Sequence, residues 1–349
     1  MRLIDRATFP RDKLCGDTVN PGTLAILRRL EMAAWIDEFG LRIDGMRVTG
    51  ESGIAVDGRY PGELHGRALL RRDLDWALLQ QAIAAGADFA PGVTVRRALV
   101  DGRGVSGVLV ARNGSDQELR ARVTIAADGR RSTLAFGLGV ARHPDRPRRW
   151  AIGGYYENAE GTSTLGEMHV RAGRYIGVAP VPGGLANVCV VQPSGPGDAA
   201  LRNPVAVLQR ELARDPVLGI RFAGARLVQP PVVLGPLAVD VTGATIDGLL
   251  LAGDAAGFVD PMTGDGLRFA VRGAELAAGA ALAALEHGWT GVHRRLAQQR
   301  RAEFAGKWQF NRVLRAVVAS PRSVAAAAFG ARVAPGVVRA LIARAGDCT

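Results

Sequence analysis

The sequence predicts an α/β fold with an antiparallel β insert, and three observations carry that prediction. Strand-like and helix-like segments alternate at both ends of the chain, residues 141–240 read mostly as strands and turns, and everything after residue 289 reads as helix. Alternating strands and helices are typical of a sheet covered by helices, whereas runs of strands form antiparallel sheets. No internal repeat interrupts this pattern.

The first half of the chain begins with a short strand that ends at Asp5, followed by a loop rich in Gly and Pro. Apolar residues at helical spacing then predict a helix over 23–38 and a second over 70–85. Short strands and turns are expected at 43–66. Three further strands, joined by Gly-rich turns, are expected at 93–100, 107–111 and 119–126.

In the second half, one helix is expected near 203–214 within the strand-rich insert. Residues 246–252 are almost entirely apolar, which predicts a buried strand. A Gly-rich turn follows it, and a long helix is expected over about 264–286. The remaining residues continue as helix.

Composition places the chain among globular proteins. Of its 349 residues, 48% are hydrophobic and 22% are charged, which excludes long disorder and fits one large or two modest domains. Its three cysteines are far apart, so neither a disulfide framework nor a Cys-rich zinc site is expected. The five histidines have no ligand spacing, and we expect no metal. The absence of an apolar run of 18 residues argues against a membrane-spanning helix.

The positive charge is concentrated at one end. Residues 288–349 carry 11 basic side chains against Glu303 and Asp347, which accounts for +9 of the net +11. A general nucleic-acid surface would not be so one-ended, and we expect no nucleic-acid partner.

The only GxGxxG pattern, Gly102 to Gly107, is predicted to be a hairpin turn. A dinucleotide fingerprint must pass from a strand into a helix, whose N-terminus then meets the pyrophosphate. Here the next segment, 108–111, reads Val-Leu-Val-Ala and is another strand. The glycines therefore serve a turn between two strands.

A more specific pattern joins the buried strand 246–252 to the long helix. The strand ends at Gly253-Asp254, and a second turn, 260–266, precedes the helix. Glycine permits close approach to a ligand, Asp254 is placed to accept hydrogen bonds from hydroxyls, and a helix N-terminus favours negative charge. These features suit a ligand with a polyol and an electron-rich ring, such as a flavin; the alternative is a capped turn without a ligand. A third strand-to-helix turn carries Asp128-Gly129.

Together these motifs resemble the superfamily of flavin monooxygenases and geranylgeranyl reductases, which has the fold of para-hydroxybenzoate hydroxylase. Its members carry an Asp-Gly motif in mid-chain and a Gly-Asp motif before the last long helix, here Asp128-Gly129 and Gly253-Asp254. The stretch 9–16, Phe-Pro-Arg-Asp-Lys-Leu-Cys-Gly, is similar to a motif of the reductase-like branch. Arg71 matches an arginine that begins a family helix and faces the cofactor. The resemblance covers roughly 1–290.

The resemblance implies a Rossmann-like FAD-binding domain with an inserted antiparallel substrate domain and C-terminal helices. It implies FAD as cofactor and NAD(P)H as reductant. Cys15 and Gly16 are expected to line the active site; for Cys15 the alternative is a small buried apolar residue. The implied cofactor-binding positions are Asp5, Arg6, Lys13, Cys15, Gly16, Arg71, Asp128, Gly129, Gly253, Asp254, Pro261, Gly264, Asp265 and Gly266.

Domain boundaries follow from the same resemblance. The FAD-binding domain is expected at 1–42, 67–140 and 241–288, the substrate domain at 43–66 and 141–240, and a basic helical region at 289–349. Family members begin with a strand, a GxGxxG turn and a helix before the strand that ends here at Asp5. That unit is absent, and we expect an N-terminally truncated chain.

The resemblance leaves two reactions open, because the flavin carries the chemistry in both. As a geranylgeranyl reductase-like enzyme, the protein would reduce a C=C bond of an isoprenoid or other lipophilic substrate by hydride transfer; the motif at 9–16 favours this. As a monooxygenase, it would hydroxylate an aromatic or polyketide-like substrate. A truncated, non-catalytic fragment is the third alternative. No motif identifies the substrate or the oligomeric state.

The basic tail raises the question of a membrane. Lys307, Arg315 and Arg322 share one face of a predicted helix, and a cationic helix with an apolar face can lie on an anionic membrane. We expect Trp308 or Phe310 to insert; the alternative is that their apolar stripe packs on the core. The protein is expected in the cytoplasm, peripheral at the inner face of the membrane.

Overall fold

The computed structural model describes residues 1–51, 53–145, 148–195, 197–243 and 245–348 of the chain. An eight-stranded sheet forms one side of the molecule. All pairings in it are antiparallel except that of β14 with β4. In spatial order its strands are β17 (Arg226–Leu227), β13 (Arg149–Glu157), β16 (Leu185–Pro193), β15 (Arg174–Val181), β14 (Leu165–Arg171), β4 (Gly45–Thr49) and β5 (Ala55–Arg59), with β18 (Val232–Leu234) on β13. Strands from both expected regions, 43–66 and 141–240, therefore meet in one sheet.

Parallel strands occur in two separate pairs. In the first, β1 (Arg2–Asp5) lies beside β7 (Asp88–Pro91); in the second, β11 (Thr124–Ala126) lies beside β20 (Leu249–Leu251). Within the described residues, no strand joins the two pairs. One apolar core nevertheless connects both pairs with the large sheet.

Three small antiparallel sheets complete the β structure. The hairpin predicted for Gly102–Gly107 is confirmed, because β8 ends at Asp101 and β9 begins at Gly104. The three sheets are β8 (Thr94–Asp101), β9 (Gly104–Arg112) and β10 (Ser115–Arg120); β2 (Thr18–Val19), β6 (Gly66–Ala68) and β3 (Leu41–Ile43); and β12 (Ala141–Arg142) with β19 (Asp240–Val241).

The helix expected over 23–38 is instead two helices, α1 (Pro21–Arg29) and α2 (Ala33–Phe39). Glu31 between them has a φ of 61°, in the left-handed region. The N–H of Met32 turns back to donate to the carbonyl of Leu27 at 3.1 Å, and the Met32 side chain is buried. Burial of Met32 at this turn compensates for a backbone conformation that the helical pattern alone does not predict.

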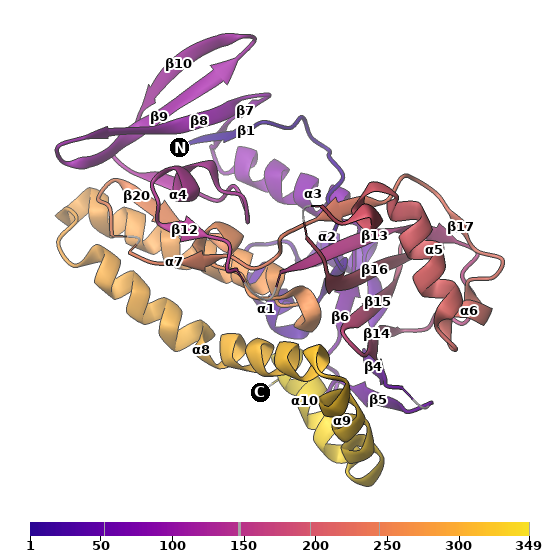
Figure 1. Cartoon of the computed structure of the whole chain (residues 1–349). Helices are drawn as coiled ribbons and strands as arrows, with labels where there is room; N and C mark the ends of the chain where they lie inside the picture. The colour runs from indigo at the N-terminus through magenta and orange to yellow at the C-terminus, as the bar shows by residue number, and fades with distance from the viewer. Residues whose placement is uncertain (52, 146–147, 196, 244, 349) are drawn as a thin grey trace.

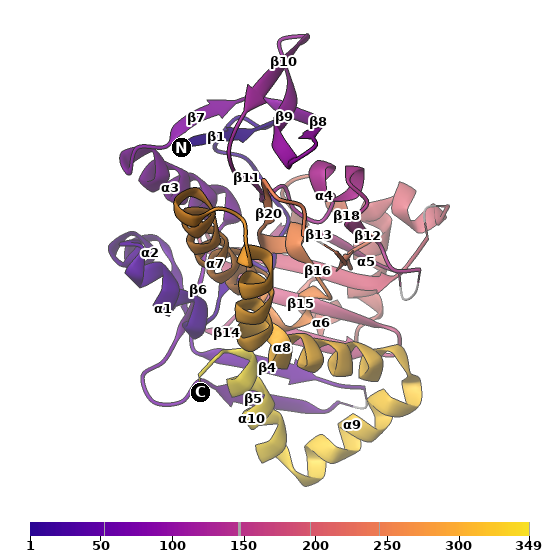
Figure 2. The ribbon, with the colours of Figure 1, turned by 90° about the vertical axis from the view of Figure 1, so that its left-hand side faces the viewer.

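Two long helices run together across the molecule (Figures 1 and 2), α7 (Gly266–His287) and α8 (Val292–Ala319). Phe304 of α8 packs edge-on against Phe269 of α7, with ring centroids 5.1 Å apart. The Arg300 guanidinium donates to the carbonyls of Leu251 at 3.2 Å and Ala256 at 2.9 Å. These two hydrogen bonds attach the first half of α8 to the end of β20 and to η2.

The remaining helices lie around this frame. The last two form a bent pair that projects beyond β4 and β5 (Figures 1 and 2). The remaining helices are α3 (Arg71–Ala84), α4 (Thr133–Gly137), α5 (Pro204–Arg214), α6 (Leu218–Arg221), α9 (Pro321–Val333) and α10 (Pro335–Ala345), with 3₁₀ turns η1 (Ala199–Arg202), η2 (Gly253–Ala256) and η3 (Pro261–Thr263).

Candidate cofactor and substrate site

The two aspartate–glycine turns leave the same edge of a parallel pair. Ala126, the last residue of β11, stands opposite Leu251, the last residue of β20, and the N–H of Ala252 donates to the Ala126 carbonyl at 2.9 Å. The Asp128-Gly129 turn and the Gly253-Asp254 turn therefore emerge side by side. Ligands of open α/β sheets bind at this carboxyl edge.

Both turns use glycine for its backbone freedom. Gly129 has a φ of 81° and Gly253 a φ of 59°, backbone angles that residues with a side chain rarely adopt. Asp128 is exposed, and its carboxylate accepts the Thr133 N–H at 2.8 Å at the start of α4. Asp254 is half-buried and is the second residue of η2, which packs on α7.

A chain of charged side chains runs along the loop after β1. Arg11 lies 3.8 Å from the Asp5 carboxylate and 3.5 Å from that of Asp75. Arg71 donates to both oxygens of the Asp75 carboxylate, at 2.7 and 3.1 Å. Asp5 also accepts the N–H of Ala7 at 2.8 Å, which fixes its side chain at the end of β1.

Lys13 and Arg130 extend this chain of charges to Asp254. Crowding by protein atoms lowers the pKa of the Lys13 ammonium, as does the charge of Arg71, although Lys13 remains accessible to water. Burial raises the pKa of Asp254, and the charges of Lys13, Arg130 and Arg71 oppose that rise. Burial likewise lowers the pKa of Arg130. Three cations thus face one half-buried carboxylate, which is an electrostatic environment suited to an anionic, hydroxyl-bearing ligand.

Cys15 lies against the same arginine. Burial alone would lower the pKa of Arg71, but the neighbouring Cys15 and Asp75 outweigh it and hold the pKa above its usual value. The backbone carbonyl of Cys15 accepts a hydrogen bond from the Asn187 side chain at 2.7 Å, which attaches the loop to β16. Sequence predicted Cys15, Lys13 and Arg71 at one site, and the structure brings them together.

The turn between η2 and α7 is held at both ends by buried aspartates. Asp260 accepts the Tyr175 hydroxyl at 2.5 Å and lies 3.7 Å from Arg149. Asp265 accepts from Lys307 at 3.1 Å and from the Thr263 hydroxyl at 2.6 Å. These contacts attach the turn to the large sheet on one side and to α8 on the other.

Glycines of this turn and of the loop after β1 leave room for a flat ligand. A Cβ added at Gly16 or at Gly264 would meet only the Thr18 hydroxyl, at 3.9 Å in each case. Gly264 has a φ of 70°, and the helix α7 begins two residues later, at Gly266. The first N–H groups of any α-helix have no intrahelical acceptor, so this end of α7 can stabilise negative charge.

These residues fit a flavin. Glycines flank the open space at the end of α7, a carboxylate faces the cations, and the buried Nε of Arg130 has no hydrogen-bond partner among the described residues. Asp254 would hold the ribityl hydroxyls, Lys13 and Arg130 would supply positive charge, and the turn Pro261–Gly264 would border the ring.

Three predicted positions do not face this space in the way expected. Asp265 directs its carboxylate to Lys307 and Thr263, because burial requires it to be paired. Asp128 is exposed and caps α4, and Arg6 is exposed beside Asp5.

Conversely, the prediction omitted three residues of the charged chain: Arg11, Asp75 and Arg130. Two had a local signal, since Asp75 lies one helical turn after Arg71 and Arg130 directly follows Asp128-Gly129.

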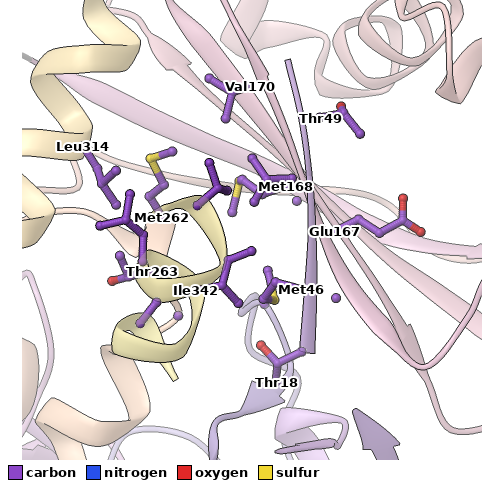
Figure 3. A pocket seen from close by; sticks show the side chains of 18 of the residues that line it. Thr18, Met46, Thr49, Glu167, Met168, Val170, Met262, Thr263, Leu314 and Ile342 are labelled. Carbon is purple, nitrogen blue, oxygen red and sulfur yellow. The ribbon is translucent and has the colours of Figure 1, made fainter. Parts of the chain in front are cut away.

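An apolar cavity of about 280 Å³ begins at these glycines and extends between the large sheet and the C-terminal helices. In Figure 3 the side chains of Met262, Leu314, Met168, Met46 and Ile342 lie around a common space, each from a different element. Gly16, Thr18 and Gly264 line the end next to the turn. Most other lining residues are aliphatic, which suits a lipophilic ligand.

Residues 1–191 match the family described as FAD binding domain. Menaquinone reductase of Mycolicibacterium smegmatis is 32% identical over 293 residues, which cover 79% of this chain and 69% of that protein. Digeranylgeranylglycerophospholipid reductase 2 of Methanopyrus kandleri is 32% identical over 235 residues, covering 65% and 57%.

Solved structures share the fold at low identity. A geranylgeranyl bacteriochlorophyll reductase-like protein from Thermoplasma acidophilum has a TM-score of 0.80 at 22% identity, over 92% of this chain and 82% of that one. The flavin-dependent brominase Bmp2 has a TM-score of 0.83 at 20% identity, over 99% and 87%. The fold predicted from sequence is confirmed, and the chain belongs to the FAD-binding domain family as an FAD-dependent oxidoreductase.

Proposed function

We propose that this chain is a reductase that saturates a C=C bond of an isoprenoid or other lipophilic substrate at its flavin. The observation that carries the proposal is the junction of cavity and turn: Gly16 and Gly264 border the predicted flavin position and also line the apolar cavity. A double bond held there would lie against the cofactor. The names of the menaquinone and digeranylgeranylglycerophospholipid reductases support a substrate of this class.

The protein's part in the reaction is to bind, orient and exclude water. When bound and reduced, FAD would supply the hydride that the reaction requires, and a proton drawn from solvent would complete the saturated bond. Asp254 would accept hydrogen bonds from the cofactor's hydroxyls, and the N-terminus of α7 would stabilise negative charge on its ring. The aliphatic cavity wall holds the substrate by burial of its apolar surface and keeps water away from the reacting carbon.

We further propose NADH or NADPH as the reductant of the flavin, and a location in the cytoplasm at the inner face of the membrane. A soluble dinucleotide would reach the enzyme from the aqueous side, whereas a lipophilic substrate partitions into the bilayer. The location therefore follows from the substrate class proposed for the cavity.

The test is the mass of the organic product. The FAD-loaded protein, reduced with dithionite and mixed anaerobically with a detergent-solubilised polyprenyl substrate, should yield a product that has gained two hydrogen atoms. A product that instead gains one oxygen atom, and only when oxygen is admitted, would establish a monooxygenase. Protein heated to unfold it provides the control for non-enzymatic reduction.

A further inference from the structure

We propose that the α9–α10 pair docks the protein on an anionic lipid bilayer, with the cavity open towards that bilayer. The proposal rests on the proposed function, which requires a lipophilic substrate, but its evidence is separate. It consists of the apolar outer face of these helices, their charge and their position over the cavity.

Large apolar side chains stand exposed along the outer face of the pair. Phe329 and Val333 of α9 are each 70% exposed, Val337 of α10 is 59% exposed and Leu341 is 39% exposed. They follow one another at intervals of four residues across the bend at Pro335. Figures 1 and 2 both show this pair projecting from the body of the protein. A projecting apolar face of this kind marks an interaction surface.

The positive charge of α9 and α10 indicates an anionic partner. The sequence has no acidic residue between Glu303 and Asp347, and Arg322, Arg332, Arg339 and Arg344 are all exposed on the two helices. Arginine binds phosphate well, and basic residues near an anionic bilayer are attracted to its surface. Apolar side chains flanked by arginines match the interface of a membrane rich in anionic phospholipid.

The same two helices form a wall of the cavity. Val324, Ala331 and Ile342 line it from within, while Phe329 and Val333 face outward. Leu341 lines the cavity and is also exposed, so the cavity reaches the surface at α10. A volume of about 280 Å³ is just below the range of pockets for small ligands, which span roughly 300–1,000 Å³. A long isoprenoid chain would therefore extend out of the cavity at this point.

The base of the pair is held firmly, which fixes the orientation of its tip. Lys307 of α8 donates to the carbonyls of Arg344 at 2.8 Å and Ala345 at 2.9 Å, and pairs with Asp347 at 3.1 Å. The bend between α9 and α10 lies at the opposite end of the pair. Contact of the tip with a bilayer would consequently orient the cavity mouth towards it.

The residues that we expected to insert are not the exposed ones. Trp308 packs against Phe304 and Phe269, with ring centroids 5.8 and 6.5 Å apart, and Phe310 lines the cavity. Both face inward because α8 lies between the core and the cavity. Phe329 and Val333 are instead the side chains that insert into the bilayer. Among the described residues, no single helix is long and apolar enough to span a membrane; α8 and α9 pass that test only as a pair bent by 110°.

Vesicle flotation of the full FAD-loaded chain tests the proposal without catalysis. The wild type should float with phosphatidylcholine–phosphatidylglycerol vesicles at low salt. It should not float with them at high salt, and it should not float with vesicles of phosphatidylcholine alone. The double variant Phe329→Glu/Val333→Glu should lose at least about tenfold in vesicle affinity. Arg322→Glu/Arg339→Glu should weaken flotation with the anionic vesicles at low salt.

Control variants introduce glutamate at exposed residues outside α9 and α10. Ile220, 78% exposed on α6, and Val100, 58% exposed on β8, are replaced as Ile220→Glu and Val100→Glu, and Arg112→Glu matches the charge variants. These should float like the wild type, and all variants should retain FAD. Absence of flotation of the wild type, or unchanged flotation of Phe329→Glu/Val333→Glu, would overturn the proposal. So would a dimer in light scattering that the same double variant dissociates, because a second copy would then cover this face.

The outcome is independent of the proposed function. Reduction of a detergent-solubilised substrate needs no bilayer, so a protein that reduces it but never floats would contradict only the docking surface. A protein that floats but does not reduce it would contradict only the proposed reaction.

Discussion

The hydroxyl of Tyr155, on β13, donates a hydrogen bond of 2.6 Å to the carboxylate of Asp17, in the loop directly after Cys15. Asn187 of β16 donates to the same carboxylate oxygen and to the carbonyl of Cys15. Asp17 is fully buried, and its other oxygen has no hydrogen-bond partner among the described residues. This group joins the predicted active-site loop to the large sheet.

Burial makes Asp17 a pH-dependent element of stability. Burial raises its pKa from 3.8 to about 6, and the hydrogen bonds from Tyr155 and Asn187 only partly oppose this. Between these two pH values the folded protein binds the proton more tightly than the unfolded chain. The contribution of Asp17 to stability is therefore fully present below pH 3.8 and is lost as the pH rises through about 6.

Asp17→Asn should remove this pH-dependent contribution to stability. From about pH 4 to pH 7 the free energy of unfolding of the wild type should fall, relative to the variant, by roughly 2 kcal/mol. Urea unfolding of both proteins at the two pH values measures the difference. Asp116→Asn, at an exposed site on β10, is the control and should show no such change. A difference between wild type and Asp17→Asn that is constant with pH would refute the prediction.

Asp254→Ala should weaken the binding of FAD. Asp254 is the half-buried carboxylate that Lys13, Arg130 and Arg71 face, and it is placed to accept hydrogen bonds from cofactor hydroxyls. Loss of such bonds costs roughly 1–3 kcal/mol, or about ten- to a hundredfold in affinity. Flavin absorbance after dialysis measures the effect, with exposed Asp73→Asn as control. Unchanged FAD content in Asp254→Ala would exclude Asp254 from the cofactor site.

Gly58→Ala should disturb the packing of α10 on β5. A Cβ at Gly58 would lie 2.6 Å from Cδ1 and 3.0 Å from Cβ of Ile342, so α10 would have to shift. Overpacking of this kind costs roughly 1–3 kcal/mol. Gly102→Ala, where no atom lies within 4 Å, is the control. Thermal melts should show Gly58→Ala less stable and Gly58→Ala/Ile342→Val partly restored; equal melting temperatures for Gly58→Ala and wild type would show that α10 is not held there.

Lys307→Met should destabilise the fold through Asp265. Burial raises the pKa of Asp265 and Lys307 opposes that rise, so removal of the ammonium leaves a buried carboxylate without its charge partner. Breaking a buried pair costs roughly 3–5 kcal/mol. Addition of Asp265→Asn should recover part of the loss in urea unfolding. If the double variant is no more stable than Lys307→Met, the Asp265–Lys307 pair is not the source of the loss.

Local patterns predicted the framework of the fold and several residues that the structure brings together, among them Lys13, Cys15 and Arg71. The GxGxxG stretch could be assigned to a hairpin because a strand follows it, and the structure supplies the reason for two of its glycines. A Cβ at Gly104 would lie 2.2 Å from the Asp247 carbonyl, and one at Gly107 would lie 2.1 Å from that of Leu119. They permit close backbone contact within the protein rather than with a phosphate.

The remainder depends on contacts that sequence spacing does not carry. Tyr155 lies 138 residues from Asp17, and Lys307 lies 42 residues from Asp265. No period of 2 or 3.6 residues predicts such pairs. The cavity was unpredictable for the same reason, since its lining residues come from elements far apart in the sequence, among them β4, β14, β15, η3, α8, α9 and α10. The inward orientation of Trp308 likewise follows from its packing on Phe304.

The most direct test of the central claim, that cavity and flavin turn form one reductase site, uses Gly177. It stands opposite Met168 in the β14–β15 pairing and lines the cavity, and a Cβ there would meet only the Cys189 carbonyl, at 3.9 Å. Gly177→Leu should therefore fill the cavity while leaving the FAD site intact.

The measurement is the anaerobic reoxidation of reduced flavin by a detergent-solubilised polyprenyl substrate, followed by stopped-flow absorbance in wild type and Gly177→Leu. The account predicts reoxidation of the wild type in proportion to the substrate added. It predicts reoxidation at least about tenfold slower in Gly177→Leu, a loss of roughly 1.4 kcal/mol, at equal FAD content. Equal rates in the two proteins, or a wild-type flavin that is reoxidised only by oxygen, would contradict it.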